Sequence, residues 1–197
     1  MKISPLKTLL LSSILWMPLG FAIWFYLGGL FAYPTEKILD LILPILTHGI
    51  VVTIAQSGHL FDIQTALTTV MPDGRLGTIF LDSNPLIYGY GLPMIFGLVM
   101  SSPIERNETI KQLSLGTLAV VLVQSWGITW EILKKLQFQA GPEGEAAIAS
   151  LGLNQEVIAF FYQMGYLIFP SLIPVIVWVL MNRVFVEDLV MMPPTDD

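Results

Sequence analysis

The stretch that decides the fold, residues 82–100, reads DSNPLIYGYGLPMIFGLVM. Its polar start contains Asn84-Pro85, a pair that favours a turn or the beginning of a helix. Residues 85–102 carry no charged side chain, which is just enough apolar sequence to cross the hydrocarbon core of a bilayer. We therefore interpret residues 85–102 as a membrane-spanning helix that directly follows a segment exposed to water.

Small residues repeat along one face of this predicted helix. Gly89, Pro93 and Gly97 are four residues apart and lie on the same side, where small residues let a second helix come close. We expect the Tyr162/Tyr166 face of the last membrane helix to fill that groove.

Two further tyrosines of the same stretch, Tyr88 and Tyr90, stand at its entry, where amphipathic rings favour the membrane–water boundary. We prefer the simpler interpretation of a membrane helix with an interfacial tyrosine pair, because anchoring and close packing explain these residue types adequately.

The composition places the chain among integral membrane proteins. Of its 197 residues, 54% are hydrophobic and 12% are charged, and the mean hydropathy is +0.72. Ordinary soluble domains carry about twice that charged fraction. The net charge of −6, without a basic cluster, argues against nucleic-acid binding. The chain has no cysteine, which excludes disulfides, thiolate metal sites and a cysteine nucleophile.

Three other apolar runs, 9–32, 113–133 and 157–180, predict further membrane helices. Pro34 follows the first run and should end it, and Asn154 is a suitable N-cap before the last. The predicted fold class is an all-α integral membrane bundle of four transmembrane helices. It forms a single membrane domain over residues 1–190, followed by a disordered tail at 191–197.

Residues 35–56 allow two interpretations. Glu36, Asp40, Pro44 and His48 form a polar stripe at helical spacing, opposite an apolar stripe. We prefer an amphipathic helix in the membrane interface, because a carboxylate is costly at membrane depth. The alternative is a fifth span over residues 38–55.

Residues 58–83 change character and predict a β-hairpin. Apolar and polar side chains alternate, and Met71-Pro72-Asp73-Gly74-Arg75 is a strong turn signal. An open strand edge cannot face lipid, so residues 35–83 should lie outside the hydrocarbon core. With four spans and an inner N-terminus, this insert is extracytoplasmic. The Lys and Arg count is five inside to four outside, and it is also five to four with a fifth span, so it does not decide the orientation.

The sequence contains no recognisable catalytic motif. It lacks a G-x-S-x-G elbow and a phosphate-binding loop, and its two histidines match no familiar metal-ligand spacing. We expect no catalytic residue, no metal and no cofactor. The candidate packing or partner-binding residues are Asn84, Pro85, Tyr88, Gly89, Tyr90, Pro93, Gly97, Trp126, Glu131, Tyr162, Gln163 and Tyr166.

Several of these residues belong to short motifs that together resemble the exosortase H-associated membrane protein family. The motifs are GRLG at 74–77, NPLIYGYGLP at 84–93, QSWG at 124–127, YQMGY at 162–166 and the closing Asn182-Arg183. The resemblance covers nearly the whole chain. It implies a multi-pass protein of the bacterial inner (cytoplasmic) membrane that is a partner of an exosortase-type enzyme.

Enzymes of that type cleave a C-terminal sorting signal and transfer the protein towards the cell surface, using a cysteine nucleophile. This chain has no cysteine, so the resemblance implies a noncatalytic accessory or scaffold. The alternative is a small multi-pass transporter or channel subunit, because Gly89, Pro93, Pro170 and Pro174 interrupt two of the predicted membrane helices.

Overall fold

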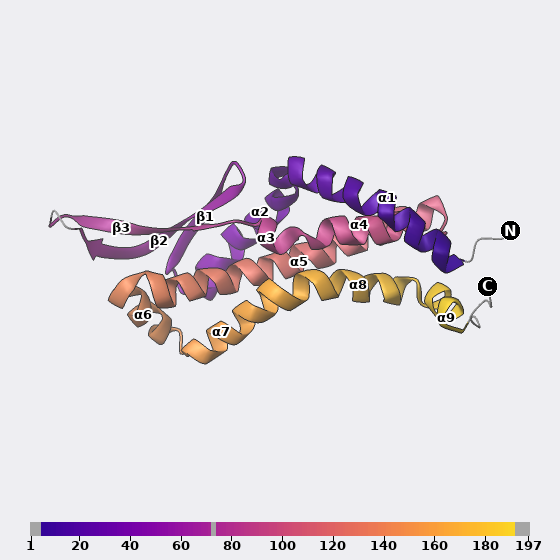
Figure 1. The fold of residues 1–197 in the computed structure, drawn as a ribbon. Coiled ribbons are helices and arrows are strands. Elements are labelled where there is room, and N and C mark those ends of the chain that lie inside the picture. Colours follow the sequence, from indigo (N-terminus) through magenta and orange to yellow (C-terminus); the bar gives the residue numbers. More distant parts are fainter. Residues whose placement is uncertain (1–4, 72–73, 192–197) are drawn as a thin grey trace.

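The computed structural model describes residues 5–71 and 74–191, and it is mostly helical. The molecule is elongated. Figure 1 shows both ends of the chain at one end of the molecule and a small sheet at the other. The fold therefore has two parts, a helix bundle near the termini and a mixed sheet-and-helix part far from them.

Four helical segments pack side by side in the bundle, and α4 contacts each of the other three. They are α1 (Pro5–Tyr26), α4 (Gly91–Ser101), α5 (Arg106–Gln139) and α8 (Phe169–Met181). A single turn, α3 (Leu86–Gly89), precedes α4. Leu92, Ile95 and Val120 are among the buried side chains that form the core of the bundle.

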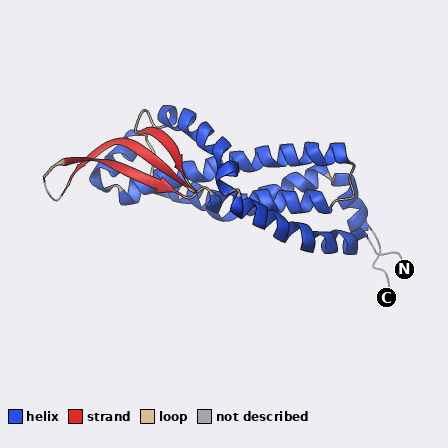
Figure 2. Ribbon diagram, turned by 90° about the horizontal axis from the view of Figure 1, so that it is seen from above, coloured by secondary structure: helices blue, strands red, loops and turns tan. Residues whose placement is uncertain are grey.

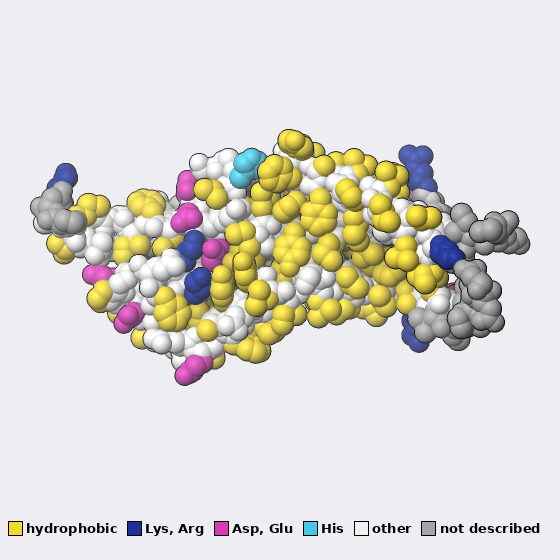
Figure 3. Space-filling view, in the orientation of Figure 1, with side chains coloured by type: hydrophobic (Ala, Val, Ile, Leu, Met, Phe, Trp, Pro, Cys, Tyr) yellow, Lys and Arg dark blue, Asp and Glu magenta, His cyan; other side chains and the backbone are white. Residues whose placement is uncertain are grey.

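Three helical segments are long and apolar enough to cross a membrane, and Leu86–Ser101 is a shorter apolar helix. The three are Leu6–Tyr26, Arg106–Gln139 and Gln155–Met181. Hydrophobic side chains cover the bundle in Figure 3, whereas acidic side chains gather over the part that carries the sheet.

The longest helix, α5, runs through both parts of the molecule. At about 1.5 Å per residue, its 34 residues span about 51 Å. Its uncharged stretch, 112–130, accounts for about 28 Å, close to the thickness of a bilayer core. The remaining residues, from Glu131 onward, extend beside the sheet and contact β3.

After α5 the chain folds back through α6 (Gly141–Ser150) and returns along α7 (Gln155–Gln163). As predicted, Asn154 caps α7, and its Oδ1 accepts a hydrogen bond of 2.8 Å from the Val157 amide. A wider turn, η1 (Met164–Ile168), joins α7 to α8. The last described helix is α9 (Arg183–Met191), which includes the first residue of the predicted tail; residues 192–197 lie outside the described part of the chain.

The sheet has three antiparallel strands in the order β1-β2-β3. They are β1 (Val51–Ser57), β2 (Leu60–Val70) and β3 (Leu76–Ser83). Alternate residues of β2 (Phe61, Ile63 and Thr65) are buried against the helices, and the residues between them are exposed. The far part of the β2–β3 pair projects beyond the helices (Figure 2).

The predicted hairpin is correct for β2 and β3 but omits β1. The amphipathic helix expected to continue to about Gln56 ends at Leu46 as α2 (Gly28–Leu46). His48 and Gly49 then adopt left-handed backbone conformations, with φ of 50° and 85°, which stop the helix. The following β-branched run pairs with β2 and buries Val51 and Ile54.

The apolar run 9–32 is divided between two helices. α1 ends at Tyr26, and α2 begins at Gly28 and continues through Pro34, so Pro34 does not end a helix as expected. The chain instead turns at Leu27, whose φ of −103° and ψ of 17° interrupt the helix. Gly28 then packs close to Leu86 of α3, because an added Cβ would lie 2.5 Å from Leu86 Cδ2.

The small-residue face packs on a different helix from the one predicted. Gly97 lies against α1, where an added Cβ would come within 2.5 Å of Met17 Cγ. Gly89 faces Gln124, and Pro93 lies against Gly20 of α1. The glycine that faces α8 is Gly91, whose added Cβ would be 2.7 Å from Pro174 Cγ. The periodicity identified a contact face, but it could not identify the helix that packs on it.

We predict that Gly97→Leu destabilises the contact between α1 and α4. Overfilling a tight contact costs about 1–3 kcal/mol, so the melting temperature in detergent should fall. The matched control is Ala22→Leu, because Ala22 is exposed on α1 and has room for a larger side chain. Equal melting temperatures for the two variants would show that Gly97 is not in a packed contact.

Candidate functional site

Polar side chains, most of them buried, collect where the sheet meets the bundle. We call this group the polar junction; its members are Thr35, Ser83, Tyr88, Gln124, Glu131 and Lys135. They come from α2, β3, α3 and α5. Buried polar groups must be hydrogen-bonded to be tolerated, so their partners define the geometry of the junction.

Gln124 holds three separate segments together from the middle of α5. Its Oε1 accepts a hydrogen bond of 2.6 Å from Thr35 Oγ1, and its Nε2 donates one of 2.8 Å to the Pro85 carbonyl. Gln124 is 1% exposed and Thr35 is fully buried. The turn at Asn84-Pro85 is also stabilised locally, because Asn84 Oδ1 accepts a hydrogen bond of 3.1 Å from the Leu86 amide. The Asn84-Pro85 turn is therefore tied to both α2 and α5.

Glu131 links α5 to the end of β3 by a hydrogen bond, and it also forms an ion pair within α5. Its carboxylate accepts a hydrogen bond from Ser83 Oγ at the end of β3, and it lies 3.3 Å from Lys135 Nζ. Lys135 also donates to the Asp82 carbonyl and lies 3.6 Å from the Asp82 carboxylate. Because Ser83 is buried, loss of the Glu131 carboxylate would leave the Ser83 hydroxyl without this partner.

Tyr88 fills the space between these links. Its side chain is 1% exposed and is packed inside the protein, whereas Tyr90 is half-buried. The Tyr88 hydroxyl interacts electrostatically with Glu131 and Tyr162. Its ring lies against Gly127, where an added Cβ would be only 2.2 Å away. A side chain at position 127 would therefore displace the Tyr88 ring.

An aromatic stack extends from Tyr88 to the surface. Tyr88 and Tyr166 meet edge to face at 6.2 Å, and Tyr162 and Tyr166 are stacked with ring centroids 5.7 Å apart. Lys134 Nζ lies 4.2 Å from the Tyr162 ring centroid, close enough for a cation–π interaction. The predicted tyrosines of the last helix thus contact the predicted tyrosine of α3, rather than the glycine face.

The other predicted residues lie elsewhere. Trp126 belongs to an aromatic group on the outer side of α5 with Trp130, Phe161 and Phe169. Gln163 is exposed. Pro93 and Gly97 lie in the contact with α1 described above. Of the predicted residues, Tyr88 and Glu131 therefore belong to the polar junction, and Asn84, Pro85, Gly89, Tyr162 and Tyr166 lie next to it. Tyr90, Pro93, Gly97, Trp126 and Gln163 lie outside this group.

A third polar contact joins α2 to the sheet. Asp40 Oδ1 accepts hydrogen bonds of 2.8 Å from the Ile54 amide and from Thr53 Oγ1. These two bonds lower the pKa of the Asp40 carboxyl below its usual value of 3.8. Asp40 thus satisfies a backbone donor of β1 and fixes α2 beside the sheet.

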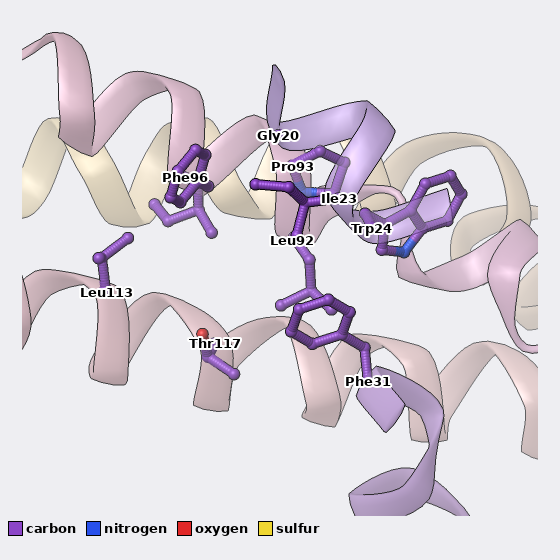
Figure 4. Close-up of a pocket in the computed structure, with 10 residues that line it drawn as sticks. Gly20, Ile23, Trp24, Phe31, Leu92, Pro93, Phe96, Leu113 and Thr117 are labelled. Carbon is purple, nitrogen blue, oxygen red and sulfur yellow. The ribbon is translucent and has the colours of Figure 1, made fainter. Parts of the chain in front are cut away.

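The bundle contains an apolar cavity of about 190 Å³ between α1, α4 and α5. Figure 4 shows Trp24, Leu92, Phe96 and Phe31 around it, with Thr117 at its edge. This lining offers packing surface but no titratable group. Among the described residues, no three His, Asp or Glu side chains lie close enough together to hold a metal ion.

The family model described as exosortase H-associated membrane protein matches residues 3–185. The chain belongs to the exosortase H-associated membrane protein family. The match spans both the bundle and the sheet part, so every residue of the polar junction lies within the matched range. No significant match was found among curated proteins or among solved structures.

The sequence did not identify some of the residues that form the polar junction. Thr35, Ser83 and Gln124 were not among the candidates, although each is buried and hydrogen-bonded. One signal was present for Gln124, because it is an amide inside the uncharged stretch 112–130, where an unpaired polar group is costly. Its partners are 39 and 89 residues away in the chain, which no local pattern encodes.

We predict that Gln124→Leu destabilises the junction. The change leaves the Thr35 hydroxyl and the Pro85 carbonyl without their partner, which costs about 1–3 kcal/mol for a buried group. Thermal unfolding in detergent should show a lower midpoint. Leu122→Ala is the control, since Leu122 is 57% exposed on the same helix.

The two ends of this contact should also be energetically coupled. Adding Thr35→Val to Gln124→Leu should cost less than the sum of the single changes, because both remove the same hydrogen bond. Strictly additive changes in the free energy of unfolding would contradict the hydrogen bond between Thr35 and Gln124.

Proposed function

We propose that this protein is a noncatalytic accessory of an exosortase-type enzyme in the bacterial inner membrane, acting as its partner or scaffold during C-terminal protein sorting. The observation that carries the proposal is the family match over residues 3–185. The lack of any cysteine agrees with an accessory role, because the sorting chemistry needs a cysteine nucleophile that this chain cannot supply.

We further propose four membrane crossings, by α1, by α3 with α4, by α5, and by α7 with η1 and α8. Each crossing has a stretch without Asp, Glu, Lys or Arg; these are residues 8–35, 83–104, 112–130 and 157–182. The segment of α3 and α4 is short, but it packs between α1, α5 and α8, which supply protein contacts on several sides. In this arrangement the described termini lie on the cytoplasmic side and the sheet on the periplasmic side.

The part of the protein suited to meet a partner is the projecting arm. We define it as residues 67–70 of β2, residues 76–81 of β3 and the described residues 71, 74 and 75 between the strands. Val70, Leu76 and Phe80 are 67%, 73% and 63% exposed on it. Val70 and Leu76 are paired across the two strands. Figures 1 and 3 place the arm far from the apolar surface of the bundle, so lipid of the same membrane would not cover these side chains.

The edge of the arm also suits a protein partner. Among the described strands, β3 has a neighbour on one side only, so its other edge presents backbone donors and acceptors. Exposed apolar side chains beside an open strand edge are typical of surfaces that bind another polypeptide. We therefore assign the contact with the sorting enzyme to the arm.

We predict that affinity purification of the tagged protein from its native membrane recovers an exosortase. The double change Leu76→Ala and Phe80→Ala should lower that recovery by roughly tenfold or more, because truncating central apolar anchors commonly costs about 2 kcal/mol or more. Phe138→Ala is the matched control, since Phe138 is 53% exposed near the end of α5. Recovery of unrelated proteins only, in repeated experiments, would refute the partnership; equal loss in the control would refute the role of the arm.

A further inference from the structure

The hydrogen bonds around β3 identify which of its residues face β2 and which face the free edge of the sheet. Thr65 Oγ1 donates a hydrogen bond of 2.7 Å to the Ile79 carbonyl, so the backbone of Ile79 is directed towards β2. In an antiparallel pair, alternate residues direct their N–H and C=O groups towards the neighbouring strand and away from it. The residues directed towards the free edge are therefore Leu76, Thr78 and Phe80.

The base of this free edge is closed by α5. Lys135 Nζ donates to the carbonyl of Asp82, which lies two residues after Phe80 and faces the same side. Among the described residues, β3 pairs with no strand other than β2. The part of the edge that is open to pairing is therefore residues 76–80, which belong to the arm that projects beyond the helices (Figure 2).

The free edge is self-complementary, but the membrane prevents a second copy from using it. In an antiparallel pair about a two-fold axis at Thr78, Leu76 of one copy would lie opposite Phe80 of the other. That axis is perpendicular to the strands, whereas β3 and α5 both run along the long axis of the molecule (Figure 1). The two bundles would then point in opposite directions, although copies inserted in one membrane share one orientation.

A symmetric parallel pair of β3 strands is excluded as well. Two copies in one membrane are related by an axis along the membrane normal, which would place their edge-facing residues at the same height. N–H groups would then face N–H groups, and carbonyls would face carbonyls. A parallel ladder requires the edge-facing residues of one strand to lie between those of the other. The free edge is therefore left for a different polypeptide.

The side chains beside the free edge indicate what kind of polypeptide segment fits it. Leu76 and Phe80 are 73% and 63% exposed on the outer face of the sheet, with Thr78 between them. On the other face, Ile79 and Leu81 pack against the core of the sheet part. An added strand would place every second side chain beside this outer row, where apolar and β-branched residues form stabilising cross-strand pairs.

We propose that an extended segment of the sorting enzyme adds to the sheet as a fourth strand, antiparallel to β3 over residues 76–80. Antiparallel addition lets each edge-facing residue exchange two hydrogen bonds with the residue opposite, and it is more stable per residue than parallel addition. Because β3 runs from the tip of the arm towards the bundle (Figure 1), the added segment runs outward from the membrane. This inference rests on the accessory role and membrane placement proposed above, and it adds the backbone groups that make the contact.

Hydrogen–deuterium exchange of the unaltered protein, alone and in its copurified complex with the exosortase, tests the pairing residue by residue. The amides of Leu76, Thr78 and Phe80 face the free edge, so they should exchange roughly tenfold more slowly in the complex. The amides of Gly77 and Leu81 face β2 already and should change little. Such alternation indicates an added strand, because contact through side chains alone would shield both sets alike.

Two substitutions at one position separate the backbone from the side chain. Thr78→Pro removes the central N–H of the free edge, and proline is tolerated at an edge position whose N–H faces away from the neighbouring strand. It should lower recovery of the exosortase by roughly tenfold, because a carbonyl of the added segment loses its donor. Thr78→Val keeps both the N–H and the β-branched shape, so it should recover the enzyme as the unaltered protein does. Both variants should unfold at similar temperatures in detergent.

Uniform protection across residues 76–81, or equal recovery with Thr78→Pro and Thr78→Val, would overturn the added strand and leave the accessory role intact. Failure of the unaltered protein to recover any exosortase would refute the accessory role, and the partner named here with it. After oxidation in native membranes, Thr78→Cys should give no more disulfide-linked dimer than Glu145→Cys, which is exposed on α6. An excess would overturn the proposal, since a second copy would then occupy the edge.

Discussion

The hydrocarbon core of a membrane accepts neither open strand edges nor many charged side chains, and this constraint explains the layout of the molecule. Most of the four uncharged stretches lies in the bundle, while the sheet and the surrounding acidic side chains lie in the other part of the molecule (Figures 1 and 3). Within the bundle, lipid gives no hydrophobic drive for helices to associate. Van der Waals packing must therefore stabilise the bundle, and the close contacts at Gly91, Gly97 and Gly127 provide it.

The polar junction lets the two parts act as one body. α5 passes from the bundle into the sheet part, with Gln124 in its uncharged stretch and Glu131 just beyond it. Gln124 ties α5 to α2 and to the turn before α3, and Glu131 ties it to the end of β3. A force that bends the arm would therefore be transmitted through these hydrogen bonds to α5 and to the turn before α3. These bonds connect the sheet part mechanically to the bundle.

Much of this fold could be predicted because it depends on local patterns. Uncharged length located the helices of the bundle, alternation located β2 and β3, and Asn84 and Asn154 marked two helix starts that the structure confirms. The errors have a common cause, since they concern contacts between distant segments. The run from Val51 becomes a strand only because β2 pairs with it, and helical spacing at Gly97 cannot tell α1 from α8 as the neighbour. The bridge of Gln124 joins residues up to 89 positions apart.

The central claim is that the sheet and the termini lie on opposite sides of the membrane, and single-cysteine labelling tests it most directly. The chain has no cysteine, so each variant carries one thiol. Thr78→Cys on β3, Glu145→Cys on α6 and Glu108→Cys near the start of α5 all replace exposed residues. In intact spheroplasts, an impermeant thiol reagent should label the first two, and it should label Glu108→Cys only after the membrane is opened. Labelling of Glu108→Cys from the same side as Thr78→Cys would contradict the account.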